Sequence, residues 1–180
     1  PAQAFVSKTA TAVRVPNDRI VADGKLAEPE WQQAPVATGF IQQQPREGTE
    51  PTLQSEVRFL FDDENLYVGA LLRDDEPDKL ITNELTRDFN ARDGDLFVLV
   101  LDTFHDRRNA YGFQTNPMGA IRDTQSFDEG RATNENWDSV WFIRTSTSPE
   151  GWIVEYVIPF KSLISTDLIA PLVMRSAAVI

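Results

Sequence analysis

The feature of this sequence that most restricts its fold is a short-range alternation of apolar and polar residues, which recurs along most of the chain. Val57, Phe59 and Phe61 alternate with Glu56 and Arg58. After an acidic turn, the same alternation resumes at Leu66. A period of two gives each segment one buried face, as in a β-strand, and two such segments joined by a polar turn predict a β-hairpin.

Further strand-like segments follow, whereas helical periodicity is weak throughout. The run Leu96–Leu101 is apolar on both faces, which predicts a central strand covered on each side. Short helices are expected only at Pro29–Gln33, where proline suits the first turn, and at Asp78–Ile81. The other predicted strands are Ala110–Asn116, Gly119–Phe127, Ser139–Thr147 and Trp152–Ile158. This pattern predicts an all-β fold, a two-sheet antiparallel β-sandwich of the jelly-roll or immunoglobulin-like type with one or two short helices.

Length and patterning together predict one main domain. The 180 residues are ample for a single hydrophobic core. The polar, aperiodic residues 1–17 predict an N-terminal arm, and residues 18–165 contain the predicted sandwich. Residues 166–180 form an atypical apolar segment, which we interpret as the end of a truncated module. An uncovered sheet edge invites pairing with another chain, so a homo-oligomer through such an edge is one expected assembly.

Composition excludes several classes of function. The chain has 17 basic and 28 acidic residues, a net charge of −11, and a surface of this sign repels nucleic acid and anionic membranes. It has no cysteine and one histidine, His105, which excludes thiolate chemistry and sites that need several imidazoles. No apolar run reaches the ~18 residues of a membrane span. The first residues also lack the basic and hydrophobic regions of a signal peptide.

Acidic side chains gather at the ends of predicted strands. Asp74 and Asp75 follow one strand, and Asp93 and Asp95 precede another. Carboxylates crowded on turns supply the hard oxygen ligands that calcium prefers, so a structural Ca²⁺ is expected at these residues. Solvated residues that cap strands would show the same pattern. Two carboxylates can also act as the acid and base of a glycosidase, provided that one of them lies in an apolar pocket.

The aromatic residues indicate a second kind of site. Trp152 shares a strand face with Val154 and Tyr156 and is expected in the core, with Glu155 pointing away. Trp137 instead lies in a polar loop, where it is either an exposed indole or folded back over the edge of the core. Sugar rings stack on aromatic planes, and their hydroxyls bond amides, carboxylates and guanidinium groups. The candidate carbohydrate-binding residues are Trp137, Phe89, Arg87, Arg108, Gln114, Asn116 and Asn136.

Several segments, in this order along the chain, resemble those of carbohydrate-binding module family 9. They are Val21–Trp31 with its Asp-Gly, Glu and Trp, the hairpin Ser55–Asp74, the strand Asp93–Asp102, the segment Phe113–Asn116, and Gly151–Phe160 with its Gly-Trp, Glu and Ile-Pro. The segments Phe104–Phe113 and Trp137–Trp141 are most similar to one branch of the family. That branch occurs at the N-terminus of large secreted bacterial proteins of unknown function.

The resemblance implies a β-sandwich that binds glycan, often at chain ends, with calcium ions as structural supports. In the family two tryptophans clamp the sugar, and an arginine, a glutamate and an asparagine bond its hydroxyls. Asn116 matches the asparagine, and Phe89 is the nearest candidate for the first clamp aromatic. Gln114 stands in place of the arginine, and Val98 in place of the glutamate. The resemblance therefore implies the fold more fully than it implies the sugar site.

These observations favour a non-catalytic module that stacks oligo- or polysaccharide on exposed aromatics. It is expected to belong to a larger extracytoplasmic protein, secreted, periplasmic or associated with the outer membrane, whose remainder beyond Ile180 is a second partner. Two other functions stay open. The departures at Gln114 and Val98 favour a structural domain that packs on its parent protein and binds no sugar. The other is a part of a glycoside hydrolase.

Overall fold

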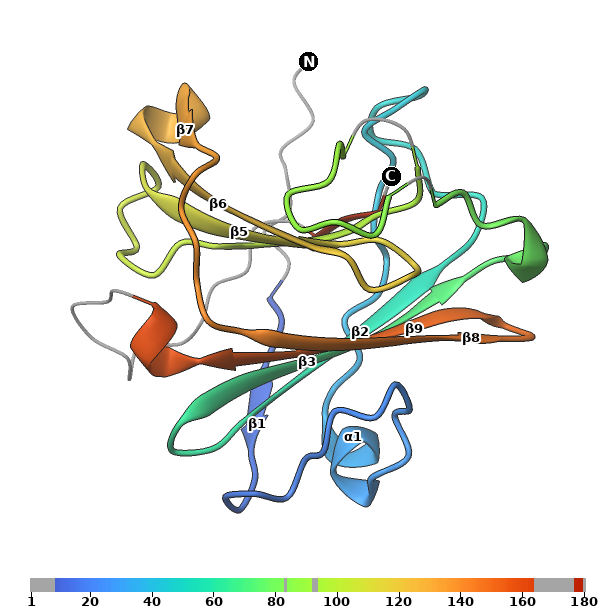
Figure 1. Ribbon diagram of the computed structural model, residues 1–180. Helices are drawn as coiled ribbons and strands as arrows, with labels where there is room; N and C mark the ends of the chain where they lie inside the picture. Colours follow the sequence, from blue (N-terminus) through green and yellow to red (C-terminus); the bar gives the residue numbers. More distant parts are fainter. Residues whose placement is uncertain (1–8, 83, 92–93, 164–176, 180) are drawn as a thin grey trace.

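The computed structural model describes residues 9–82, 84–91, 94–163 and 177–179, and its two β-sheets pack face to face (Figure 1). The first sheet consists, in spatial order, of β1 (Ala12–Arg14), β2 (Ser55–Phe61), β3 (Asn65–Arg73), β9 (Gly151–Pro159) and β8 (Phe142–Ser148). The second sheet consists of β10 (Ala177–Val179), β4 (Phe97–Leu101), β5 (Ala110–Thr115), β6 (Ile121–Phe127) and β7 (Ala132–Asn134). The predicted two-sheet sandwich is thus confirmed.

Helical structure is limited to short pieces. Helix α1 (Pro29–Gln33) has the predicted bounds and starts with its proline, where no N–H donor is needed. The second predicted helix is instead a 3-10 turn, η1 (Pro77–Lys79). Two further 3-10 turns, η2 (Asp128–Gly130) and η3 (Phe160–Ser162), follow β6 and β9. Among the described residues there is no helix long and apolar enough to cross a membrane.

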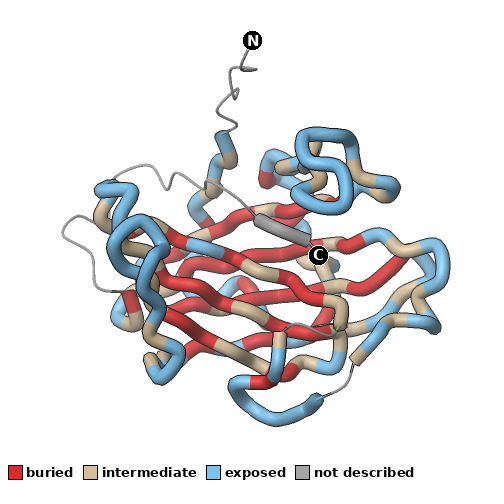
Figure 2. Tube along the Cα trace, turned by 90° about the horizontal axis from the view of Figure 1, so that it is seen from above, coloured by how far each residue is buried: buried red, intermediate tan, exposed pale blue. Residues whose placement is uncertain are grey.

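The main core lies between the sheets, where inward side chains from both sheets meet. The predicted inward residues of β9 confirm this, because Trp152 is 3% exposed and Val154 is 0% exposed. Figure 2 shows buried positions running along the strands, with exposed positions in the loops around them. Each large apolar side chain buried in this way contributes about 1.5–3 kcal/mol relative to an exposed one.

A second, smaller apolar cluster lies on the opposite face of the first sheet. It is closed by residues 15–34, which we call the N-terminal cover; in Figure 1 its helix α1 lies below that sheet. Trp31 of the cover is 0% exposed. It reaches the sheet because Gly69 on β3 has no side chain: a Cβ there would lie 2.9 Å from the Trp31 ring and 2.6 Å from Leu26. The close approach of cover and sheet therefore depends on this glycine.

Three features differ from the sequence-based expectations. Residues 12–14 of the expected arm form β1, which pairs parallel with β2, so the first sheet is not purely antiparallel. Strand β4 is not covered on both sides along its length. The preceding loop packs against Val98, whereas Val100 is 37% exposed. Within the atypical C-terminal segment, β10 pairs antiparallel with β4 of the same chain; residues 164–176 and 180 of that region lie outside the described residues.

Candidate functional site

Three of the predicted carbohydrate-binding residues come together at one side of the sandwich. Asn136 and Trp137 lie in the segment that crosses from β7 to β8, which we call the crossing segment (residues 135–141). Arg87 reaches this segment from the loop before β4, where its Nε donates a hydrogen bond to Asp138 at 2.9 Å. Asn136 is exposed, and its backbone N–H donates to Asn134 Oδ1 at 3.1 Å. This group is the lateral site.

The indole of Trp137 covers the edge of the core. Its ring lies 4.7 Å from that of Tyr111 and 6.1 Å from that of Phe113, centroid to centroid. Both of these partner rings are buried, whereas Trp137 is only half-buried. Of the two arrangements that the sequence allowed, the structure therefore has the indole folded back over the core, with part of its surface left in solvent.

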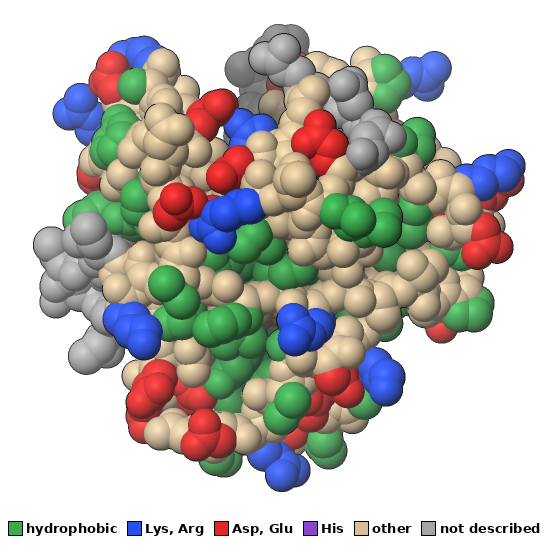
Figure 3. Space-filling model, in the orientation of Figure 1, with side chains coloured by type: hydrophobic (Ala, Val, Ile, Leu, Met, Phe, Trp, Pro, Cys, Tyr) green, Lys and Arg blue, Asp and Glu red, His purple; other side chains and the backbone are tan. Residues whose placement is uncertain are grey.

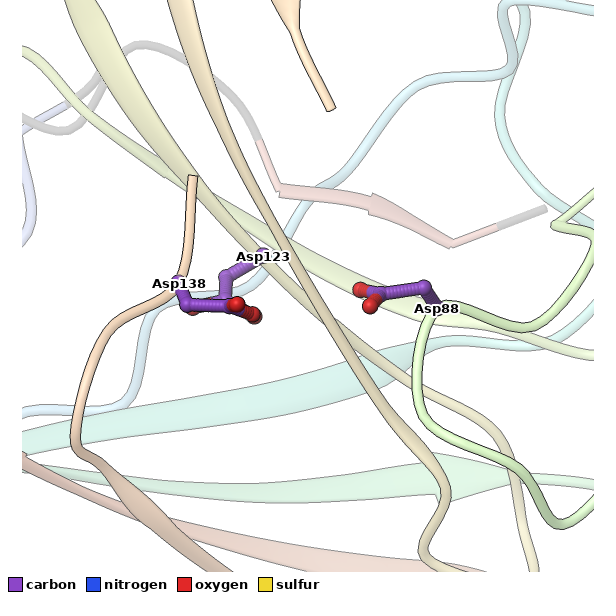
Figure 4. Close-up of side chains that lie close together, drawn as sticks. All are labelled: Asp88, Asp123 and Asp138. Atoms are coloured by element: carbon purple, nitrogen blue, oxygen red, sulfur yellow. The ribbon is translucent and has the colours of Figure 1, made fainter. Parts of the chain in front are cut away.

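Arg87 lies among three carboxylates at the lateral site. In addition to Asp138, its Nη2 donates to Asp123 at 2.7 Å, and its Nε lies 4.0 Å from Asp88. One oxygen from each carboxylate lies within 4.8 Å of the other two. Figure 4 shows Asp88 directed toward Asp123 and Asp138 from the opposite side. Such a group of oxygens can hold a metal ion.

Electrostatically, the three carboxylates favour a cation at their centre. Asp123 is 0% exposed and accepts the N–H of Ser139 at 2.5 Å. Burial raises the pKa of Asp123, and the charges of Asp138 and Asp88 raise it further, whereas the Ser139 N–H and Arg87 act in the other direction. Without a positive partner, three neighbouring carboxylates would repel one another.

Two of the four residues predicted to bind calcium accept hydrogen bonds from the backbone. Asp95 Oδ2 accepts the N–H of Ile81 at 2.7 Å, and Asp74 Oδ1 accepts the N–H of Glu76 at 2.7 Å. Asp75 is exposed, and Asp93 lies outside the described residues. Across the part of the chain that the structure describes, the one group of three acidic residues with metal-site spacing is Asp88, Asp123 and Asp138.

Phe89 and Asn116 are buried and contact other parts of the protein instead of facing a ligand. Phe89 is 2% exposed and belongs to a small buried cluster under the loop before β4. Asn116 is 3% exposed. Its Nδ2 donates to the Glu84 carbonyl at 2.7 Å, and its Oδ1 accepts the N–H groups of Met118 and Ala120 at 3.2 and 3.0 Å. Both residues therefore hold neighbouring loops together.

The two remaining predicted residues lie on the outer face of the second sheet. Gln114 stands there in register with Val98 and Arg122, and its amide has no hydrogen-bond partner among the described residues. Arg122 is bonded to Glu135 at 2.8 Å. At the far end of this face, Arg108 lines a shallow depression of about 230 Å³. Gln114 and Arg108 thus lie on the outer face of the sheet, whereas Trp137 packs on the inward rings of Tyr111 and Phe113.

Comparison with known proteins gives the family of the chain. Residues 21–173 match the family described as carbohydrate family 9 binding domain-like, so the chain belongs to that family. The chain is similar in structure to a solved carbohydrate-binding module of family 9 from Caldicellulosiruptor kristjanssonii, in complex with cellotriose. The similarity covers 82% of this chain and 67% of that module, with a TM-score of 0.55 and 17% sequence identity. The same module in complex with glucose is similar over 82% and 68%, with the same TM-score of 0.55 and identity of 17%. No curated protein matches the chain in a sequence comparison.

Proposed function

We propose that this domain is a non-catalytic carbohydrate-binding module of an extracytoplasmic protein and that it holds its saccharide at the lateral site. The observation that carries the proposal is that Arg87 meets the pair Trp137 and Asp138, which is distant from it in sequence. The accessible part of the Trp137 indole lies next in the chain to Asp138, which is bonded to Arg87. Domains of this family are non-catalytic binding modules. The solved family-9 module that resembles this chain in fold was found with cellotriose and with glucose.

In this proposal each residue has a distinct role. The apolar C–H face of a sugar ring packs on the exposed part of Trp137, a contact worth about 0.5–1.5 kcal/mol beyond the area buried if it resembles an aromatic pair. The Arg87 guanidinium and the Asp138 carboxylate bond the hydroxyls, and the Asn136 amide adds a donor and an acceptor. Binding is weak because each displaced water must be replaced by an equally good partner.

Substitutions at the lateral site and on the outer face of the second sheet test where the saccharide binds. We expect Trp137→Phe, which keeps an aromatic ring on Tyr111, and Arg87→Gln each to weaken cellotriose binding by roughly two- to tenfold. Isothermal titration calorimetry measures this. Gln114→Ala, on the outer face, is the matched control and should bind as the wild type does. If Gln114→Ala abolishes binding and the other two do not, the site lies on the outer face.

A second candidate function is a structural domain that packs on its parent protein and binds no sugar. The observation that favours it is the interior position of Phe89 and Asn116 together with the kind of apolar side chains on the surface. Among the described residues the large exposed ones include Val140 at 62%, which precedes the edge strand β8, and Phe142 at 57%, which begins it, but no tryptophan or tyrosine. Figure 3 shows apolar side chains reaching the surface across one face. No binding of millimolar cellotriose or glucose by the wild type would favour this function.

A hydrolase is the remaining alternative. Release of reducing ends from polysaccharide by the isolated domain would support it, whereas we expect none from a non-catalytic module. We propose that any glycoside hydrolase activity belongs to other parts of the parent protein.

We also propose that calcium binds the three carboxylates of the lateral site. Asp88, Asp123 and Asp138 offer hard oxygen ligands, and the Ser139 carbonyl, which Arg87 contacts at 3.4 Å, lies beside them. An ion and the guanidinium compete for the same oxygens, so Arg87 has to move aside for the ion to bind.

Melting temperatures measured with calcium and with chelator test this competition. At roughly ten times its Kd, calcium should raise the melting temperature of the wild type by about 3–5 °C. In chelator, Arg87→Met should have a lower melting temperature than the wild type, because the three carboxylates then lack the positive charge of Arg87. Calcium should raise the melting temperature of this variant by more than it raises that of the wild type. If only Arg87→Met responds, Arg87 is the resident cation of the wild type and the calcium proposal is wrong. No response from either protein would also contradict it.

A further inference from the structure

Glu155 is a buried acidic residue that no binding function explains. It lies on β9 and points away from the main core, as its position in the strand predicts. It is nevertheless only 1% exposed, because the N-terminal cover lies over it. A carboxylate at such a depth is costly unless its environment compensates for the loss of water.

The compensation comes from the backbone of the cover. Glu155 Oε2 accepts the N–H groups of Asp23, Gly24 and Lys25 at 2.9, 2.6 and 3.2 Å. Ser146 on the neighbouring strand β8 donates its hydroxyl to the Gly24 carbonyl at 2.5 Å. The turn 23–25 is therefore tied to the sheet by two side chains, of which only Glu155 titrates.

The other carboxylate oxygen has no such support. Glu155 Oε1 is buried and has no hydrogen-bond partner among the described residues. A lone charged oxygen in this position is unfavourable, whereas a protonated oxygen carries no charge to be solvated.

The elements packed against Glu155 differ in the charged groups that they place near it. The cover brings the acids Asp23 and Glu28, and Lys25, whose Nζ lies 3.9 Å from Asp23. Strand β8 places Arg144 in register with Glu155, where its Nη1 donates to the Ile143 carbonyl at 2.9 Å. On the other side, β3 has Gly69 in register, which carries no charge. Beyond it on β2, Arg58 is bonded to Glu56 at 3.1 Å.

From this geometry we propose that Glu155 is a proton-controlled latch for the N-terminal cover. The cover is held most tightly while Glu155 carries a proton, and it opens more readily once Glu155 is ionised. Opening uncovers the apolar cluster that includes Leu60 and Tyr67 on the outer face of the first sheet.

The direction follows from the proton affinities of the closed and open states. In the closed state burial raises the pKa of Glu155 from 4.5 to about 7, and Glu28 and Asp23 raise it as well, although the N–H groups of Gly24 and Asp23 act in the other direction. In the open state Glu155 returns to water and to its ordinary pKa. The closed state therefore binds the proton more strongly, and its added stability is complete below the ordinary pKa. That stability is lost as the pH rises toward 7. Above this pH Glu155 is ionised in both states, so the opening constant no longer changes with pH through this group.

Hydrogen exchange of the cover amides, followed by mass spectrometry and corrected for the intrinsic pH dependence of exchange, tests the latch. Between about pH 5.5 and pH 8, the opening constant of residues 15–34 should rise on the order of tenfold in the wild type. Glu155→Gln keeps an acceptor oxygen but cannot ionise, so its opening constant should not change with pH. Ser146→Ala removes the other tie and should raise opening by the same factor at every pH.

Two results would overturn the proposal. One is a wild-type opening constant that stays constant over this pH range, and the other is a slope that persists in Glu155→Gln. If Glu155→Gln does not fold, a direct ¹³C NMR titration of the Glu155 carboxyl in the wild type decides the question. A midpoint at the ordinary glutamate value contradicts the latch, and a midpoint near neutrality supports it.

Discussion

Replacing Trp31 with alanine should lower the free energy of unfolding by about 3–5 kcal/mol. Trp31 is 0% exposed and is the largest side chain of the cluster beneath the N-terminal cover. Its ring rests against Gly69, so the deletion leaves a cavity that the glycine cannot fill. Urea unfolding followed by far-UV circular dichroism measures the loss.

Trp31→Phe is the matched control. Trp31 Nε1 has no hydrogen-bond partner among the described residues, so phenylalanine removes volume without breaking a hydrogen bond. We expect a loss of about 1–2 kcal/mol for this smaller deletion. If Trp31→Ala unfolds at the same urea concentration as the wild type, the cover contributes nothing to global stability and the reasoning is wrong.

Gly151→Ala should be at least as damaging, for a different reason. Gly151 begins β9 with a φ of 135°, a conformation that side chains disfavour. A Cβ there would overlap the carbonyl oxygen of Leu72 and lie 2.8 Å from the Arg73 Cα, and both of these are backbone atoms that cannot turn aside. Backbone strain and overpacking together should cost about 3–5 kcal/mol, by the same urea measurement.

Gly48→Ala separates the two contributions to that loss. Gly48 also has a positive φ, 79°, but nothing lies within 4 Å of the position that a Cβ would take there. It should lose only about 1–2 kcal/mol, from strain alone. Equal losses in the two variants would show that β3 moves to accept the methyl group at position 151.

The strands that could be predicted from the sequence are those long enough to show their period. β3 and β9, with nine residues each, alternate several times; the alternation that resumes at Leu66 falls within β3, and the predicted strand Trp152–Ile158 falls within β9. β1, β7 and β10 have three residues each, too few for any periodicity. They form because a neighbouring strand offers its edge, as β2 does for β1.

The lateral site was only partly predictable. Residue type identifies Arg87, Asn136 and Trp137 as candidates, but it does not predict that Asp88, Asp123 and Asp138 meet, because these three come from separate segments. One signal was present in the sequence. Asp123 occupies an inward position of the strand β6, and a charged residue on a face that packs inward needs a partner. Its partner Arg87 is 36 residues away along the chain.

The sequence by itself determined the strand-rich class, the main hairpin and helix α1, because these depend on residues within a few positions of one another. It also displayed the Asp23-Gly24 turn, Trp31 and Glu155 as separate elements of one family pattern. Only the tertiary structure decided that Glu155 accepts hydrogen bonds from that turn. It alone also decided that Trp137 covers the edge of the core. The physical reason is that burial and pKa depend on which distant segments pack together, and local periodicity does not determine which segments these are.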